Sequence, residues 1–288
     1  MKLLLASAAP IALFGLLASG QSESKAPAPL PVDAQWSTSR LWDDGLAEVA
    51  RYDATRTIYG KERRFELVSV VVKEELDRKL LVKSDRPGAA ENLEALKLNL
   101  TQRIETENYP YHFLTSVFVE RADVRRFVKE TNGSQEWCGN TFLEVLAAPS
   151  GVLLRWHSYW DGEGDGERTM ERPANALLED GLWLALRAAK LEAGKEHAVQ
   201  LLPSRIQTRL GETSWVPATV VLAGREDVEV PAGKFTANRY EVRFSGGRVD
   251  RYWVDHEMPH AMLKVEQPAL QGRSAALREL KRWAYWQR

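Results

Sequence analysis

The sequence predicts a mainly β protein, built as a curved antiparallel sheet or open half-barrel with one helix near residues 175–190. Three observations predict this class. Apolar residues alternate with period two through most of the chain after Leu41, Gly- and Pro-rich turn signals separate the alternating runs, and only one segment has helical spacing. The 288 residues are 44% hydrophobic and 27% charged, which is the balance of a globular chain.

The first 40 residues lack this alternation. A lysine at position 2, an apolar run from Leu3 to Leu17 and the small residues Ala18-Ser19-Gly20 predict a signal peptide over residues 1–20. The protein is therefore expected to be periplasmic or secreted, with no membrane span after cleavage. Residues 21–40 begin with a Pro-, Ala- and Ser-rich stretch and are predicted to be a flexible linker.

Residues 41–288 are predicted to form a single β-rich domain with two β halves, 41–172 and 195–288. In residues 62–74, Phe65, Leu67 and Val71 share one strand face. Comparable runs predict further strands, and the ambiguous tail 274–288 is interpreted as a last strand. The other predicted strands are 47–59, 94–105, 111–120, 140–147, 151–160, 196–202, 215–222, 236–244, 247–254 and 261–266.

One segment between the halves has helical spacing. Leucines recur at helical intervals from Asn175 to Lys190, Asn175 could cap the start, and Gly194 could end the region. The spacing predicts a helix that separates the two halves.

Charge and cysteine content restrict the function. The 39 Lys and Arg residues against 40 Asp and Glu residues predict no nucleic-acid partner. Cys138 is the single cysteine, so no intramolecular disulfide can form. A nucleophilic pair with His157 is conceivable, but a buried, small apolar role for Cys138 is the expectation.

The segment His256-Glu257-Met258-Pro259-His260 matches the H-E-x-x-H pattern of zinc hydrolases. That chemistry requires a helix, because only a helix places both imidazoles on one face. Pro259 would break such a helix, and the flanking residues alternate like strands. A turn between two strands is therefore predicted, with a zinc-dependent hydrolase using His256 and His260 as the alternative.

Acidic residues also alternate with glycine from Asp161 to Glu167, in the manner of a calcium loop. Arg168 and Arg172 stand where that loop needs an aliphatic residue and a bidentate glutamate. An exposed hairpin loop is the favoured interpretation, and no cofactor is expected. A weak calcium site remains open, with Asp161, Glu163 and Asp165 as its ligands.

The chain has ten tryptophans. Burial in a large β core explains them most simply, since each indole removes a large apolar area from water. Alternatively, they line a concave sheet that holds an apolar ligand. The candidate ligand-binding residues are Trp156, Trp160, Trp253 and Trp283.

Several segments resemble exported bacterial families. Val230-Pro-Ala-Gly-Lys-Phe235, the strand around Trp253 and Pro259 to Lys264 resemble an uncharacterised exported β-protein family with a Pro-Ala-Gly-x-Phe turn. Leu41 to Val49, Ser134 to Gly139 and the region after His157 resemble exported proteins, often lipoproteins, that carry the label septum formation inhibitor Maf. That name belongs to cytosolic α/β nucleotide pyrophosphatases, so the predicted export signal and β pattern do not support their activity here.

Together these features predict an exported envelope protein of unknown function. We expect non-catalytic binding of an apolar ligand or a protein partner on a concave sheet, by analogy with the half-barrels of periplasmic lipoprotein carriers.

Overall fold

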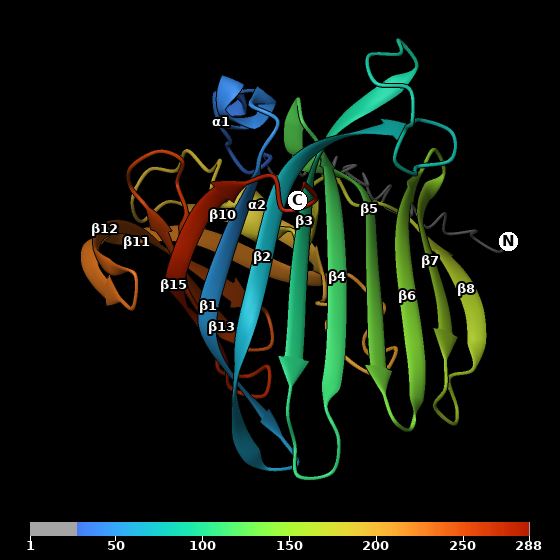
Figure 1. The fold of residues 1–288 in the computed structure, drawn as a ribbon. Helices are drawn as coiled ribbons and strands as arrows, with labels where there is room; N and C mark the ends of the chain where they lie inside the picture. Colours follow the sequence, from blue (N-terminus) through green and yellow to red (C-terminus); the bar gives the residue numbers. More distant parts are fainter. Residues whose placement is uncertain (1–27, 288) are drawn as a thin grey trace, which may run out of the picture.

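A computed structural model describes residues 28–287, and its dominant element is one sheet of 15 strands. The strands follow one another in the order β8-β7-β6-β5-β4-β3-β2-β1-β15-β14-β13-β12-β11-β10-β9. Each pair is antiparallel except β9 with β10, which run parallel. The sheet curls so that β10–β13 lie behind β1–β4, giving an open, barrel-like shape (Figure 1).

The helical elements are short: α1 (Ala34–Ser37), the 3-10 turn η1 (Arg40–Asp43) and α2 (Leu182–Ala185). The strands are β1 (Ala47–Ile58), β2 (Lys61–Asp77), β3 (Asn92–Ile104), β4 (Tyr111–Glu120), β5 (Asp123–Glu136), β6 (Gly139–Ala148), β7 (Gly151–Ser158), β8 (Asp165–Met170), β9 (Ala176–Leu178), β10 (Glu196–Leu202), β11 (Val216–Val230), β12 (Gly233–Phe244), β13 (Val249–Asp255), β14 (Met262–Gln267) and β15 (Arg273–Trp283).

The curvature has a local cause in the strand registers. The pairing shifts between Arg51 and Tyr52 on β1, between Leu222 and Gly224 on β11, and between Trp253 and Val254 on β13. Extra residues at such bulges bend a strand and increase its twist. Long strands with bulges can therefore wrap around a core that a flat sheet could not enclose.

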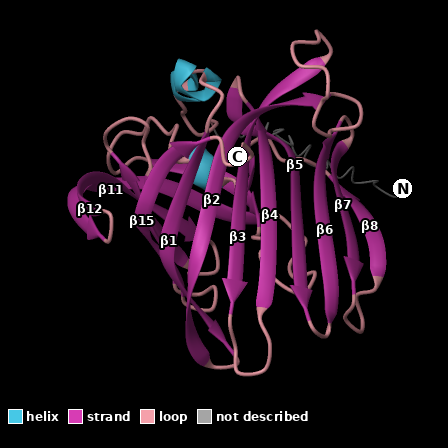
Figure 2. Cartoon of the chain, viewed as in Figure 1, coloured by secondary structure: helices cyan, strands magenta, loops and turns pink. Residues whose placement is uncertain are grey.

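The inside of the curve is filled by the chain itself. The segment from β9 through α2 crosses the interior, where the short helix is seen between the front and back strands (Figure 2). Leu182, Leu184 and Leu186 are fully buried there. The Trp183 ring meets the ring of Tyr52 on β1 edge to face, with centroids 5.4 Å apart. This segment is thus the central core element of the fold.

The two sheet edges, β8 and β9, are not paired with each other. Side chains bridge this opening instead. The Trp160 indole donates to the carbonyl of Thr208 at 2.7 Å, and the Trp215 indole donates to the carbonyl of Glu171 at 2.9 Å. Arg168 on β8 donates to the hydroxyl of Thr213 at 3.0 Å. These bonds fasten the loop before β11 to the β7–β8 side of the sheet.

The N-terminal residues pack against the barrel. Leu30, Trp36 and Trp42 are each 3% exposed or less. The Trp36 and Trp42 indoles meet edge to face, and each donates to a backbone carbonyl, of Pro259 and Trp36 respectively. The predicted flexible linker over residues 21–40 is therefore wrong for residues 30–40. The predicted signal peptide over residues 1–20 lies outside the described residues.

A buried ion pair joins this region to the crossing segment. Arg187 donates two hydrogen bonds to the carboxylate of Glu48, at 2.6 and 2.8 Å, and both residues are nearly inaccessible to solvent. Arg187 also donates to the carbonyls of Pro259 and His260 and lies over the Trp36 ring. This one guanidinium therefore connects β1, the interior segment, α1 and the β13–β14 loop.

The predicted fold class is confirmed, including the strand in the tail, which is β15. The helix predicted over Asn175 to Lys190 is wrong in extent, since only Leu182–Ala185 are α-helical. Its leucines are buried on every side, so their spacing does not mark one helical face. Residues 176–178 pair with β10 instead, and a turn at Asp180 and Gly181 precedes α2.

We predict that Glu48→Ala lowers the free energy of unfolding by about 3–5 kcal/mol, because it leaves the Arg187 guanidinium buried and without a counter-charge. Urea denaturation followed by circular dichroism measures the change. Glu62→Ala is the control, since Glu62 pairs with Arg64 on the exposed surface and should leave the urea midpoint unchanged. Equal midpoints for both variants would contradict the structural role of the pair.

Candidate functional site

A cluster of charged side chains lies inside the curve of the sheet, where apolar residues would be expected. This interior polar cluster is contributed by β5, the β12–β13 turn, β13, β14, β15 and the two interior segments that follow β9 and β10. Its members are Glu130, Glu179, Asp180, Arg205, Arg248, Asp250, Gln267 and Arg273.

Arg248 holds one half of the cluster together. Its guanidinium donates hydrogen bonds to the carboxylates of Glu179 and Asp250, which are 1% and 0% exposed. Burial opposes its charge, but the hydrogen bonds that it donates to these two carboxylates outweigh burial and raise the pKa of Arg248. The Gln267 amide donates to Asp250 at 2.9 Å and to the hydroxyl of Tyr252 at 3.2 Å. The charges in this half are thus matched by direct partners.

The other half fixes the loop after β10. Asp180 accepts from the backbone N–H of Arg205 at 2.8 Å. The Arg205 guanidinium is fully buried and donates to the carbonyls of Pro203, Leu210 and Glu212. Burial lowers the pKa of Arg205, which nearby carboxylates counteract. Arg205 therefore organises a loop rather than facing open space.

Glu130 faces this cluster from β5 and is 1% exposed. Burial raises the pKa of Glu130 well above its ordinary value, and the neighbouring Asp180 carboxylate, with which it shares a hydrogen bond, raises it further. Two carboxylates in contact away from water cannot both ionise at low cost. Burial therefore favours the protonated form of Glu130.

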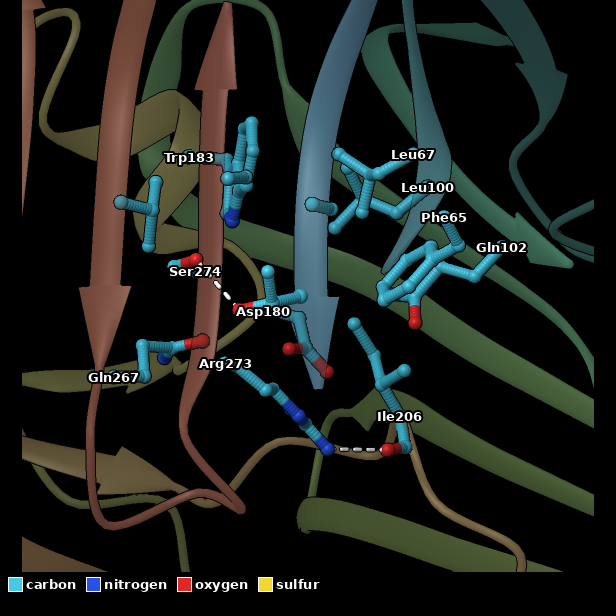
Figure 3. A pocket seen from close by; sticks show the side chains of 14 residues that line it. Phe65, Leu67, Leu100, Gln102, Asp180, Trp183, Ile206, Gln267, Arg273 and Ser274 are labelled. Atoms are coloured by element: carbon cyan, nitrogen blue, oxygen red, sulfur yellow. Dashed lines mark hydrogen bonds between the residues drawn. The ribbon is translucent and has the colours of Figure 1, made fainter. Parts of the chain in front are cut away.

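A cavity of about 40 Å³ adjoins the polar cluster. Figure 3 shows its walls, with β15 on one side and β1 on the other, and the Arg273 side chain bonded to the carbonyl of Ile206. Its lining is apolar on one part and polar on another, and it comprises Ala54, Thr55, Phe65, Leu67, Leu100, Gln102, Asp180, Trp183, Ile206, Val265, Gln267, Arg273, Ser274 and Ala275. This volume would hold about three waters.

Three buried polar atoms around the cavity lack a hydrogen-bond partner within residues 28–287. They are Oε1 of Gln102, Nε of Arg273 and Nη1 of Arg56. Gln102 and Arg56 are each 5% exposed, and Arg56 follows the cavity-lining Ala54 and Thr55 on β1. A buried polar group without a partner costs free energy, so these atoms indicate that the cavity receives something polar.

The four tryptophans predicted to bind a ligand lie apart from this cavity. Trp156 packs against Gly166 on the neighbouring β8, and Trp160 bridges the sheet opening described above. The Trp253 indole donates to Glu226 at 2.7 Å beneath Lys264, and Trp283 is 49% exposed near the chain end. They do not form one surface.

The acidic loop does not gather its carboxylates around a common point. Glu163 accepts hydrogen bonds from the Ser158 hydroxyl and the Leu210 backbone N–H. Asp165 lies 3.4 Å from the His157 ring instead. Across residues 28–287 no group of three His, Cys, Asp or Glu side chains is placed to hold a metal, so Asp161, Glu163 and Asp165 do not form one.

The H-E-x-x-H segment is a loop between β13 and β14, as the proline predicted. Its carbonyls at Pro259 and His260 accept hydrogen bonds from Arg187. The Nδ1 atom of His260 lies 3.1 Å from the carbonyl of Asp255 in the same loop. The segment has a structural use as an acceptor for a buried arginine.

Cys138 corrects a sequence expectation, because its thiol is exposed rather than buried. It lies in the β5–β6 turn, where the Tyr109 hydroxyl is 3.1 Å from its sulfur and the exposed Trp137 stacks on Tyr109. The turn places the residue at the end of the barrel, outside the core. His157 is on β7, opposite Phe142 of β6.

These observations define the class of the protein: an open, barrel-like β protein with a polar interior and a small cavity. No protein-family model and no curated protein matches the sequence. A solved structure is similar, that of a β-barrel-like protein of domain of unknown function DUF1849 from Brucella abortus. The TM-score is 0.51 at 12% identity, over 83% of this chain and 98% of that chain, which shows a shared fold. No helix within residues 28–287 is long and apolar enough to span a membrane.

We predict that Glu130→Gln removes a pH dependence of stability. The raised pKa means that the folded protein keeps a proton that the unfolded chain loses above about pH 4.3, so wild-type stability falls as the pH rises through that window. The variant should gain on wild type by up to about 1.4 kcal/mol per pH unit there. Urea unfolding from pH 4 to pH 8 measures this, with the exposed Glu105→Gln as control. Parallel curves for wild type and Glu130→Gln would contradict it.

We also predict that the Cys138 thiol reacts in the native protein. One equivalent of a thiol reagent such as Ellman's reagent should be consumed without denaturant, because the side chain is open to solvent. The rate before and after adding urea measures this. Reaction only in unfolding urea would show that the thiol is enclosed.

Proposed function

We propose that this is an exported envelope protein that binds a small ligand, without catalysis, inside its curved sheet. The single observation that carries the proposal is the interior cavity, whose wall combines apolar side chains with buried polar atoms that have no partner within the described residues. Such a mixed wall is characteristic of ligand sites, in which apolar surface supplies affinity and a few polar groups orient the ligand.

The cavity is smaller and more polar than the tryptophan-lined concave sheet that the sequence suggested as a ligand site. The crossing segment from β9 through α2 covers much of the inner surface, so a large apolar molecule would have to displace buried leucines. Trp183, which is on α2, is the one tryptophan in the cavity wall. The small volume left beside the crossing segment therefore favours a ligand of a few atoms.

Binding is favoured over zinc hydrolysis by the use that the chain makes of its H-E-x-x-H segment. The carbonyls of Pro259 and His260 serve Arg187, and the loop geometry lacks the helix on which such a zinc site depends. Export rests on the sequence of residues 1–20 and is part of the proposal.

We predict that filling the cavity abolishes binding. Ala54→Leu places three further carbons in the cavity wall, and Ala90→Leu adds the same atoms to an exposed loop as the control. Native mass spectrometry of protein mixed with a small-molecule extract of the cell envelope should show a small bound molecule on wild type and Ala90→Leu, and not on Ala54→Leu. Equal occupancy of all three, or none on wild type, would count against the proposed function.

A further inference from the structure

We propose that the cavity binds a short-chain carboxylate, such as acetate or propionate, with Arg273 in its wall as the charged partner. The inference rests on the proposed function and names its ligand class. It begins from Arg273 in the cavity wall and the buried Arg56, whose charge acts on it, neither of which the protein neutralises by direct contact.

Neither arginine forms an ion pair within the described residues. The Nη atoms of Arg273 donate to the hydroxyl of Ser204 and the carbonyl of Ile206, both uncharged, and Nε has no partner. Arg56 donates from Nε to Gln271 at 2.6 Å and lies over the Phe113 ring, while Nη1 has no partner. Elsewhere in this interior, Arg248 and Arg187 each have a carboxylate in contact.

Two such charges close together are unfavourable. Burial lowers the pKa of Arg56 to about 8, and the positive charge of Arg273 contributes to the same shift. Burial lowers the pKa of Arg273 as well, which Asp180 and Glu179 only partly counteract. A bound anion would relieve both, because an opposite charge stabilises each guanidinium.

The cavity wall favours a singly charged ligand. It contains the Arg273 guanidinium and also the carboxyl group of Asp180. Negative charge brought close to Asp180 disfavours a doubly charged phosphate more than a monoanion.

The apolar lining and the volume of the cavity favour a small monoanion with a short alkyl group. Phe65, Leu67, Leu100 and Ile206 supply apolar surface in the same cavity as Arg273, which suits a methyl or ethyl group attached to a charged head. A space for about three waters accommodates a molecule of about four non-hydrogen atoms. A ligand of that size binds no tighter than about 40 µM, since each atom can contribute only a limited free energy.

Gln102 completes the polar side of the site. Its amide is 5% exposed, lines the cavity and leaves Oε1 without a partner. A side-chain amide can present either its oxygen or its NH₂ group toward the cavity. The NH₂ group could therefore donate a hydrogen bond to a carboxylate oxygen.

The test compares two probes of nearly equal shape. Acetate and acetamide are titrated into the full-length mature protein at constant ionic strength and pH 7, with NMR chemical shifts as the readout. Acetate should bind at least tenfold more tightly than acetamide. Arg273→Gln should reduce this preference to less than twofold, and Arg56→Gln should reduce it partly. Arg278→Gln, an exposed residue on the same strand, should retain it.

The outcomes separate the inference from the proposed function. Equal binding of acetate and acetamide to wild type would overturn the carboxylate assignment and leave a binding cavity in place. Binding of neither probe would overturn the inference. If Ala54→Leu also left the native mass spectrum unchanged, the proposed function would be overturned together with the inference. If Arg273→Gln fails to fold, the wild-type comparison alone decides, because it needs no variant.

Discussion

The structure depends on one buried guanidinium, that of Arg187. A cation enclosed among tryptophans is stable only when paired and fully hydrogen-bonded, and Glu48, Pro259 and His260 supply those partners from β1 and the β13–β14 loop. Because these partners lie far apart in the sequence, satisfying this charge also fixes how the two halves of the sheet meet. The interior segment is held in register between them.

The requirement that buried charges be hydrogen-bonded also explains why the interior is polar and yet well ordered. Arg248 is matched by Glu179 and Asp250, and Arg205 is matched by three carbonyls of its own loop. Each of these side chains places a crossing segment or loop against the inner face of the sheet. Arg273 is different because its Nε has no partner within residues 28–287, so the interior has an unsatisfied donor on a residue of the cavity wall.

The fold could be predicted from the sequence wherever the inner face of a strand is apolar, as at Leu67 and Val71 of β2. Strand β5 was not predicted, because Glu130 and Asn132 face inward and hide the alternation. The cavity was not predicted for a different reason. Arg273, Gln102 and Asp180 lie far apart in the sequence, and only the curvature of the sheet brings them together. The one signal in the sequence was the pair Glu179-Asp180 within a leucine-rich segment, which indicates acidic groups close to the core.

The similarity to the Brucella abortus structure is one of backbone shape at 12% identity, so a curved sheet of this kind does not by itself specify what it holds. Specificity must arise from residues that the sheet encloses. An interior that neutralises its own charges would be a purely structural core, and most of this one does so. The unused donors of Arg273 and Arg56 are costly for a protein that never binds anything, because a leucine or methionine at either position would remove the charge. A guanidinium in a cavity wall that also has apolar side chains is better explained by a ligand that carries a negative charge.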